Sequence, residues 1–166
     1  MTRINHMTRA AISIATFTAL MLFGTMTGFF HAFSVTVMPG LDRTTPWVAV
    51  EAMQNINIAV RNPVFFVTFF VTPIIAIIAA ILALRTKNKA AAVWLALAAI
   101  TYLATTLAPT AAINVPMNNV LALTEPALAT PQQWAEYTTD WTLWNHIRTA
   151  TCLIATGFAA IGWRKL

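Results

Sequence analysis

The sequence predicts an all-α integral membrane protein: a four-transmembrane-helix bundle with a short extra helix and a loop capping its extracytoplasmic end. Hydrophobic residues make up 58% of the 166 residues and charged residues only 9%, whereas soluble domains carry roughly 25% charged residues. Four apolar stretches are each long enough to cross a bilayer as a helix, and basic residues flank them. The length favours a single domain.

The first predicted span covers residues 10–37. Its only ionisable side chain is His31, and as a helix it would be about 40 Å long, more than the roughly 30 Å hydrocarbon core of a bilayer. Gly24 and Gly28 form a pair of small residues that lets a second backbone come close, and His31 follows on the same face. We expect this face to contact protein rather than lipid, with a homo-oligomer through Gly24 and Gly28 as one outcome.

A short helix is predicted at residues 46–60, after the polar corner that ends the first span. This segment is too short and too polar to cross a bilayer, and Pro46 suits the first turn of a helix. Gln54 and Asn57 lie three residues apart on one side of it, with Glu51 on a neighbouring stripe. We expect the helix to lie partly buried at the membrane interface.

Three further spans are predicted at residues 64–84, 90–113 and 142–163. The first of them has no charged residue, and Pro73 inside it is expected to kink the helix rather than end it, as membrane helices tolerate. A basic turn at residues 85–89 leads into the next span. The segment 124–140 contains two prolines and several polar residues, and we expect it to be irregular.

The distribution of charge predicts the orientation of the bundle. With four spans, both ends of the chain and the turn at residues 85–89 lie on one side, which then carries seven of the ten Lys and Arg residues and none of the five acids. The positive-inside rule places that side in the cytoplasm, so we expect a multi-pass protein of the inner or plasma membrane. The basic residues are too scattered for a nucleic-acid surface; the expected partners are the lipid bilayer and a lipophilic small molecule.

Polar residues interrupt the apolar segments only near the opposite, extracytoplasmic ends. These residues are His31, Glu51, Gln54, Asn57, Asn114, Asn118, Trp144, Asn145, His146 and Arg148. An ionisable residue at the end of a membrane span is costly and therefore suggests a function. Polarity at one end only predicts a pocket that opens toward the outer leaflet, rather than a channel or a proton wire.

His146 is the first candidate for a catalytic residue, because an imidazole can accept a proton near neutral pH or bind a metal. Arg148 is the candidate for stabilising an oxyanion, and His31 and Glu51 are candidates for assisting. The alternative is that His146 and Arg148 only extend to lipid headgroups at the interface.

A metal site would use His31, His146 and Glu51 as ligands for copper or iron, or the two histidines as ligands for haem. None of the short ligand spacings typical of such sites is present in the sequence, so the sequence signal for a metal is poor and a reaction without a cofactor stays an alternative.

Substrate-binding roles are assigned to four amides, Gln54, Asn57, Asn114 and Asn118, together with Trp144 and Asn145. The alternative for the amides is structural, since amides in membrane proteins often hydrogen-bond across helices and satisfy backbone groups freed by proline.

Four motifs cover all the predicted spans: Gly28-Phe-Phe-His-Ala-Phe-Ser34 with Val37-Met-Pro-Gly-Leu41, Ala52-Met-Gln-Asn-Ile-Asn57 with Asn62-Pro63, Asn114-Val-Pro-Met-Asn118, and Trp141-Thr-Leu-Trp-Asn-His-Ile-Arg-Thr149. In their order and spacing the chain resembles the anthrone oxygenase-like family of small four-helix membrane proteins, also catalogued as a domain of unknown function. The resemblance implies the fold and topology given above. It also implies an activity, because some members oxidise anthrones to anthraquinones.

The leading functional hypothesis is therefore an anthrone oxygenase-like membrane oxidoreductase, a monooxygenase or oxidase that acts on a lipophilic, phenolic molecule in a pocket at the outer leaflet. The alternative is a non-catalytic membrane protein that binds lipid or a partner subunit. A transporter is less favoured, because the chain has no inverted repeat and no charge at the middle of a span.

Overall fold

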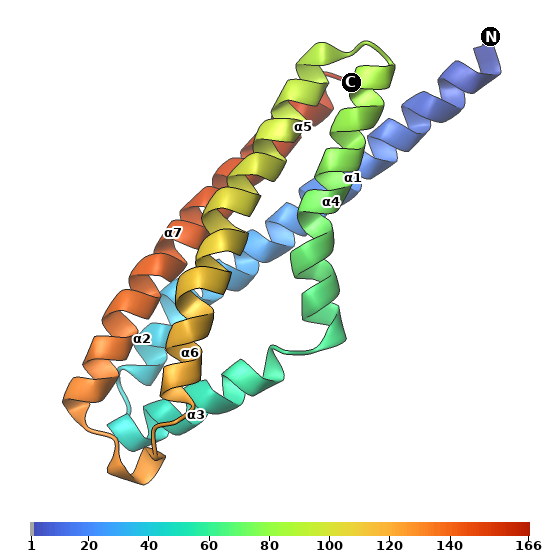
Figure 1. Ribbon diagram of the computed structural model, residues 1–166. Coiled ribbons are helices and arrows are strands. Elements are labelled where there is room, and N and C mark those ends of the chain that lie inside the picture. Colours follow the sequence, from blue (N-terminus) through green and yellow to red (C-terminus); the bar gives the residue numbers. More distant parts are fainter. Residues whose placement is uncertain (1) are drawn as a thin grey trace.

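The structure is an all-α bundle whose four long helices lie side by side (Figure 1). A computed structural model describes the backbone of residues 2–166 and the side chains of residues 7–166. The long helices are α1 (Thr2–Ala32), α4 (Pro63–Arg85), α5 (Lys89–Tyr102) and α7 (Pro131–Arg164). Helix α1 packs against α4 and α7, and α5 packs against the same two helices, which closes the bundle. Arg3, part of the basic segment before the first span, lies outside the described side chains.

Two of the helical segments extend beyond their predicted ends through π-helical turns. Helix α1 continues through η1 (Phe33–Val37) into α2 (Met38–Leu41). Helix α5 continues through the π turns η2 (Leu103–Leu107) and η3 (Thr110–Asn114) into α6 (Val115–Leu121). Turns of this kind insert an extra residue into a helix and are frequent at functional sites. The polar residues at these ends therefore lie on helices rather than in loops.

The prediction of an irregular segment over residues 124–140 was wrong for its second half. Helix α7 begins at Pro131, eleven residues before the predicted span, and a capping box between Thr130 and Gln133 closes its first turn. The short helix α3 (Pro46–Ala59) ends within a residue of its predicted boundary. It crosses the far end of the bundle, near α6 and the 3-10 turn η4 (Pro126–Leu128) (Figure 1).

Over residues 7–166, three helical segments are long and apolar enough to cross a membrane: Met7–Leu41, Pro63–Arg85 and Lys89–Leu121. Large apolar side chains such as Val67, Ile74 and Ile81 are exposed along α4, as expected for a helix that faces lipid. Helix α7 packs along the same bundle but is not among the three, because polar residues in its first half lower its hydropathy. The protein is a membrane protein; a fourth crossing by α7 is part of the proposal below.

Small residues line the contacts between the long helices, as is usual in membrane bundles, where close backbone approach replaces the hydrophobic driving force. Buried alanines on α4, α5 and α7 form these contacts. At Gly162 a side chain could not be added without movement, since a Cβ there would lie 3.0 Å from Cγ of the buried Leu95. Gly162 lies near the C-terminus, at the end of the bundle where the α4–α5 turn is found (Figure 1).

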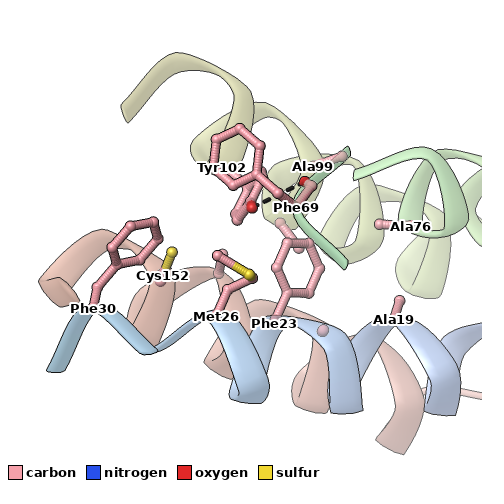
Figure 2. Close-up of a cluster of buried hydrophobic side chains, with 12 residues drawn as sticks. Ala19, Phe23, Met26, Phe30, Phe69, Ala76, Ala99, Tyr102 and Cys152 are labelled. Atoms are coloured by element: carbon pink, nitrogen blue, oxygen red, sulfur yellow. Dashed lines mark hydrogen bonds between the residues drawn. The ribbon is translucent and has the colours of Figure 1, made fainter. Parts of the chain in front are cut away.

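In the middle of the bundle a tyrosine repairs the hydrogen bonding of a proline-containing helix (Figure 2). Helix α4 continues through Pro73, which has no N–H to offer the carbonyl of Phe69 four residues earlier. The hydroxyl of Tyr102 donates to that carbonyl at 3.0 Å. Phe23 packs edge-on against the Tyr102 ring, with centroids 5.5 Å apart, so the repair lies within the hydrophobic core.

Candidate functional site

A cavity of about 400 Å³ lies at the end of the bundle far from the termini. Its walls come from the C-terminal ends of α1 and α3, the first turns of α4, the π turns before α6, and the middle of α7. The size is within the range of pockets that hold small organic molecules. The chain turns at Asn62-Pro63, between α3 and α4 (Figure 1), and Val60, Arg61 and Phe65 on either side of this turn line the cavity.

Eight aromatic side chains line the cavity: Phe29, Phe30, Phe33, Phe65, Phe66, Phe69, Phe70 and Trp141. Several of them contact one another; the ring centroids of Phe29 and Phe65 are 5.0 Å apart, and those of Phe65 and Phe69 are 5.5 Å apart in a stacked pair. Aromatic rings favour offset-stacked and edge-to-face contacts with other rings. These walls therefore suit a flat, aromatic ligand.

Arg148 is the central polar group of the cavity. Its side chain is only 3% exposed, and its guanidinium carbon lies 4.6 Å from the ring centroid of Phe30 and 5.2 Å from that of Trp141. Cation–π contacts of this kind stabilise a charge that has left water. The two aromatic rings therefore hold the guanidinium group against the cavity.

A chain of hydrogen bonds fixes the position of Arg148. Nη1 donates to Oγ1 of Thr110 at 3.1 Å, and Nη2 donates to Oδ1 of Asn145 at 3.0 Å. The amide nitrogen of Asn145 in turn donates to the carbonyl of Phe30 and to Oγ of Ser34, both at 2.8 Å. Thr110 and Ser34 belong to π turns, so the irregular turns of two helices meet at this arginine.

No acidic side chain compensates the charge of Arg148. Among the residues whose side chains are described, the arginine makes no ion pair, and all five acids of the chain are exposed. The cavity lining includes only one other ionisable residue, Arg61, which is exposed. A buried charge without a partner is strongly unfavourable in a protein interior, so the cavity is electrostatically incomplete without an anion.

Three buried polar atoms of the lining residues have no hydrogen-bond partner: Nε of Arg148, Nδ2 of Asn57 and Oδ1 of Asn114. Such atoms are rare in folded proteins, and each one requires an explanation. Two of them are donors and one is an acceptor. A ligand with an anionic oxygen and at least one hydroxyl group would satisfy all three.

Asn118 contributes a fourth amide whose orientation is fixed by aromatic donors. Its Oδ1 accepts from the hydroxyl of Tyr137 and from Nε1 of Trp141, each at 2.9 Å. The amide nitrogen of Asn118 is the group left for a ligand.

Five of the predicted site residues line the cavity together: Asn57, Asn114, Asn118, Asn145 and Arg148. Two of the predicted binding residues do not. Gln54 donates to the carbonyls of Leu121 and Thr124 at 2.9 and 2.8 Å, which is the structural role considered as its alternative. Trp144 is half-buried but is not part of the lining.

The expectation that His31, Glu51 and His146 converge is not met. All three side chains are exposed, and none lines the cavity. Over the described residues, no three His, Cys, Asp or Glu side chains are grouped in a way that would hold a metal ion. The predicted three-ligand metal set is therefore corrected. The physical reason is the rotation of each helix about its axis. Each of the three residues lies on the exposed face of its helix, away from the cavity.

The sequence analysis missed the aromatic walls and Thr110. The phenylalanines occur as adjacent pairs, and the pairs Phe65-Phe66 and Phe69-Phe70 are four residues apart, which places two aromatic rows on one side of a helix. That repeat was a usable signal. No sequence signal pointed to Thr110, because a threonine beside a proline in an apolar helix is common. Its hydrogen bond to Arg148 depends on the packing of α7.

Comparison with known proteins gives one match. The sequence profile of a protein family described as anthrone oxygenase matches residues 64–158, which is more than half of the chain. The matched segment includes Asn114, Asn118, Asn145 and Arg148 of the cavity, whereas Asn57 precedes it. No curated protein and no solved structure matches the chain.

Proposed function

Because the chain belongs to the anthrone oxygenase family, we propose that it is a membrane oxygenase that oxidises a lipophilic, phenolic aromatic molecule in the cavity around Arg148. The observation that carries the proposal is the buried, unpaired guanidinium group in a cavity with aromatic walls. A hydroxylated anthrone supplies what such a site lacks, namely flat rings and an oxygen that becomes negatively charged when the molecule loses a proton.

The proposed reaction converts a CH2 group between two aromatic rings into a carbonyl. Loss of one proton gives a carbanion whose charge is delocalised onto the substrate oxygen. The carbanion adds to O2, forming a C–O bond, and protonation gives a hydroperoxide. Loss of the second C–H proton with cleavage of the O–O bond then gives C=O and water. One CH2 group and one O2 thus give one carbonyl and one water, and no external reductant is needed.

Arg148 has the main role in this scheme. A positive charge next to the substrate oxygen stabilises the anion and lowers the pKa of the substrate. The site is pre-formed, because Thr110 and Asn145 hold the guanidinium group in place, and fixed charges aimed at a developing anion are an effective form of catalysis. Asn57, Asn114 and Asn118 bind the hydroxyl and carbonyl groups of the substrate.

His146, the base predicted from the sequence, is exposed and lies outside the cavity lining. In the proposed reaction water therefore accepts the first C–H proton of the substrate. Glu51 and His31 take no part in the reaction. Copper, iron and haem, the cofactors considered from the sequence, are not used in any of these steps.

The proposed topology has four spans, with α7 as the fourth. The termini and the basic α4–α5 turn then face the cytoplasm, following the positive-inside rule. The cavity lies at the outer leaflet, where a lipophilic substrate is concentrated. In support, the five acids all belong to the segments at the cavity end, from Asp42 to Asp140.

The test is turnover of a hydroxyanthrone by purified protein under ¹⁸O2. We expect one labelled oxygen in the new carbonyl and an Arg148→Met variant that is folded but inactive. His146→Ala serves as the matched control, because it removes a neighbouring polar residue outside the cavity, and it should keep full activity. Lost activity in His146→Ala with activity kept in Arg148→Met would reverse the assignment of roles.

A second candidate function is binding without catalysis. One observation favours it: the only ionisable residues of the cavity lining are arginines, so the site offers no side-chain base. In that case the hydroxyanthrone would bind tightly and stay unoxidised. The predicted homo-oligomer is a separate proposal. Gly24 and Gly28 are exposed with open space around them, and a second copy could pack there.

A further inference from the structure

A second polar region lies at the opposite end of the bundle, between the first turns of α1 and the α4–α5 turn. Two adjoining grooves of about 550 and 520 Å³ share Arg9, Thr86 and Lys87 in their walls. Arg85 adds a third cation to one of them. This region has no role in the function proposed above.

Among the side chains of residues 7–166, the cations of these grooves have no partner. Arg9, Arg85 and Lys87 are exposed, and none makes a hydrogen bond or an ion pair with the described side chains. No Asp or Glu side chain lines either groove. The three cations come from two separate elements and outnumber the single carboxylate at the grooves, that of the last residue, Leu166. This excess of positive charge favours an anion as the occupant.

The backbone at Lys87 adds a second observation. Its φ is +62°, the only positive φ of a residue other than glycine in residues 2–166. Lys87 follows the end of α4, and bonds from Lys87 N to Leu84 O and from Asn88 N to Ala83 O, both 2.9 Å, close the turn. A backbone conformation with positive φ after a helix end favours glycine. Lysine weakens the turn but places a cation in both grooves.

The same grooves have apolar walls on the side of the helices. The half-buried Leu82 lines one groove, and the exposed Leu166 lines the other, where Ile12 beneath it is almost fully buried. Leu82 and Ile12 belong to segments apolar enough to cross a membrane. A soluble anion would gain nothing from these walls. A phospholipid would place its phosphate among the cations and its acyl chains along the apolar residues.

We propose that these grooves bind the phosphate headgroup of an anionic phospholipid. Basic pockets between transmembrane helices are known to hold such headgroups, and arginine pairs well with phosphate. Arg9 and Arg85 contact the phosphate from opposite sides, and Lys87 supplies the third charge. The bound lipid joins the start of α1 to the α4–α5 turn.

The experiment measures binding of phosphatidylglycerol to purified protein in phosphatidylcholine nanodiscs, by native mass spectrometry after release. The test variant carries Arg9→Gln and Lys87→Gly. We expect binding at least about 10-fold weaker, the loss expected when a charge-assisted hydrogen bond to a bound anion is removed. The control variant carries Arg164→Gln and Lys165→Gln, which removes two charges at the same end of the bundle but outside both grooves.

Each outcome decides the proposal. Lys87→Gly should raise the melting temperature in phosphatidylcholine, so that weaker binding cannot be attributed to unfolding. If the test variant binds phosphatidylglycerol more weakly while binding by the control changes less than twofold, the result supports a specific site. An equal loss in both variants would mean diffuse attraction to the surface and would overturn it, as would unchanged binding. Competition by inorganic phosphate at concentrations equal to the lipid would show that the ligand is a free anion rather than a lipid.

Discussion

Replacing Arg148 by methionine tests whether the cavity is built for an anion. Methionine is uncharged and about as long as the stem of arginine, so the substitution removes the guanidinium group and keeps the packing of the stem. The wild-type side chain is buried with two hydrogen bonds, to Thr110 and Asn145, and two aromatic contacts. The substitution therefore removes both the cost of burying a charge and the contacts that offset it.

The expected change in the free energy of unfolding is small. Hydrogen bonds from a charged group contribute about 1.5–3 kcal/mol each, and a cation–π contact about 0.5–2 kcal/mol. The desolvation of a buried ion costs several kcal/mol. These contributions have opposite sign and similar size. The free energy of unfolding of the variant should therefore lie within about 2 kcal/mol of the wild-type value. It is thus suited to binding measurements.

The effect on an anionic ligand should be much larger. Loss of one charge-assisted hydrogen bond, about 1.5–3 kcal/mol, corresponds to about 10- to 150-fold in Kd. We propose a hydroxyanthraquinone and its methyl ether as matched ligands, because only the first forms an anion. The wild type should prefer the hydroxyanthraquinone, and the Arg148→Met variant should lose that preference while binding the ether as before.

The absorption spectrum of the bound hydroxyanthraquinone provides an independent measurement, since its phenolate and phenol absorb at different wavelengths. A neighbouring cation favours the phenolate, so the pKa of the ligand hydroxyl should fall on binding to the wild type and return to its free value in Arg148→Met. If the wild type binds the ether and the hydroxyanthraquinone equally well, or if the variant weakens both to the same extent, the anion site does not exist.

Two further predictions concern the bundle itself, both read from thermal unfolding in detergent. Tyr102→Phe should destabilise the protein by about 1–3 kcal/mol, because the buried carbonyl of Phe69 loses its donor; in a Pro73→Ala background the new N–H replaces that donor, and an unchanged cost there would contradict the explanation. Gly162→Ala should lower the free energy of unfolding by up to about 2 kcal/mol. Crowding against Leu95 outweighs the roughly 1 kcal/mol by which alanine stabilises a helix relative to glycine. With Leu95→Ala the same substitution should become neutral or stabilising, and a cost that persists would show that crowding is not the cause.

The secondary structure was largely predictable because it depends on local properties of the chain. Long apolar stretches predicted the three helical segments that are long and apolar enough to cross a membrane, and Pro46 marked the start of α3 to the residue. The main failure was the start of α7. Its first turns are rich in polar residues and follow two prolines, so they resemble a loop, although Thr130 and Gln133 form the capping box that begins the helix.

The composition of the cavity was less predictable, and the histidines show why. His146 and Arg148 are two residues apart, about 200° around a helix, so only one of them can face the interior. In a soluble protein the hydrophobic stripe would identify that side. In a membrane protein the lipid-facing side is as apolar as the core, and this signal is lost. The remaining signal is small residues: Cys152, Ala155 and Ala159 continue the buried stripe that contains Arg148.

The sequence by itself determined that this is a helical membrane protein and that its polar side chains gather at one end, because hydropathy and charge act on each segment independently of the others. Only the tertiary structure decided that Arg148 shares a cavity with the four predicted amides Asn57, Asn114, Asn118 and Asn145. The two described histidines that carried the first hypothesis, His31 and His146, are instead exposed. That choice depends on how each helix is rotated against its neighbours, and the rotation is set by the packing of small and aromatic side chains that are equally at home in lipid and in the core.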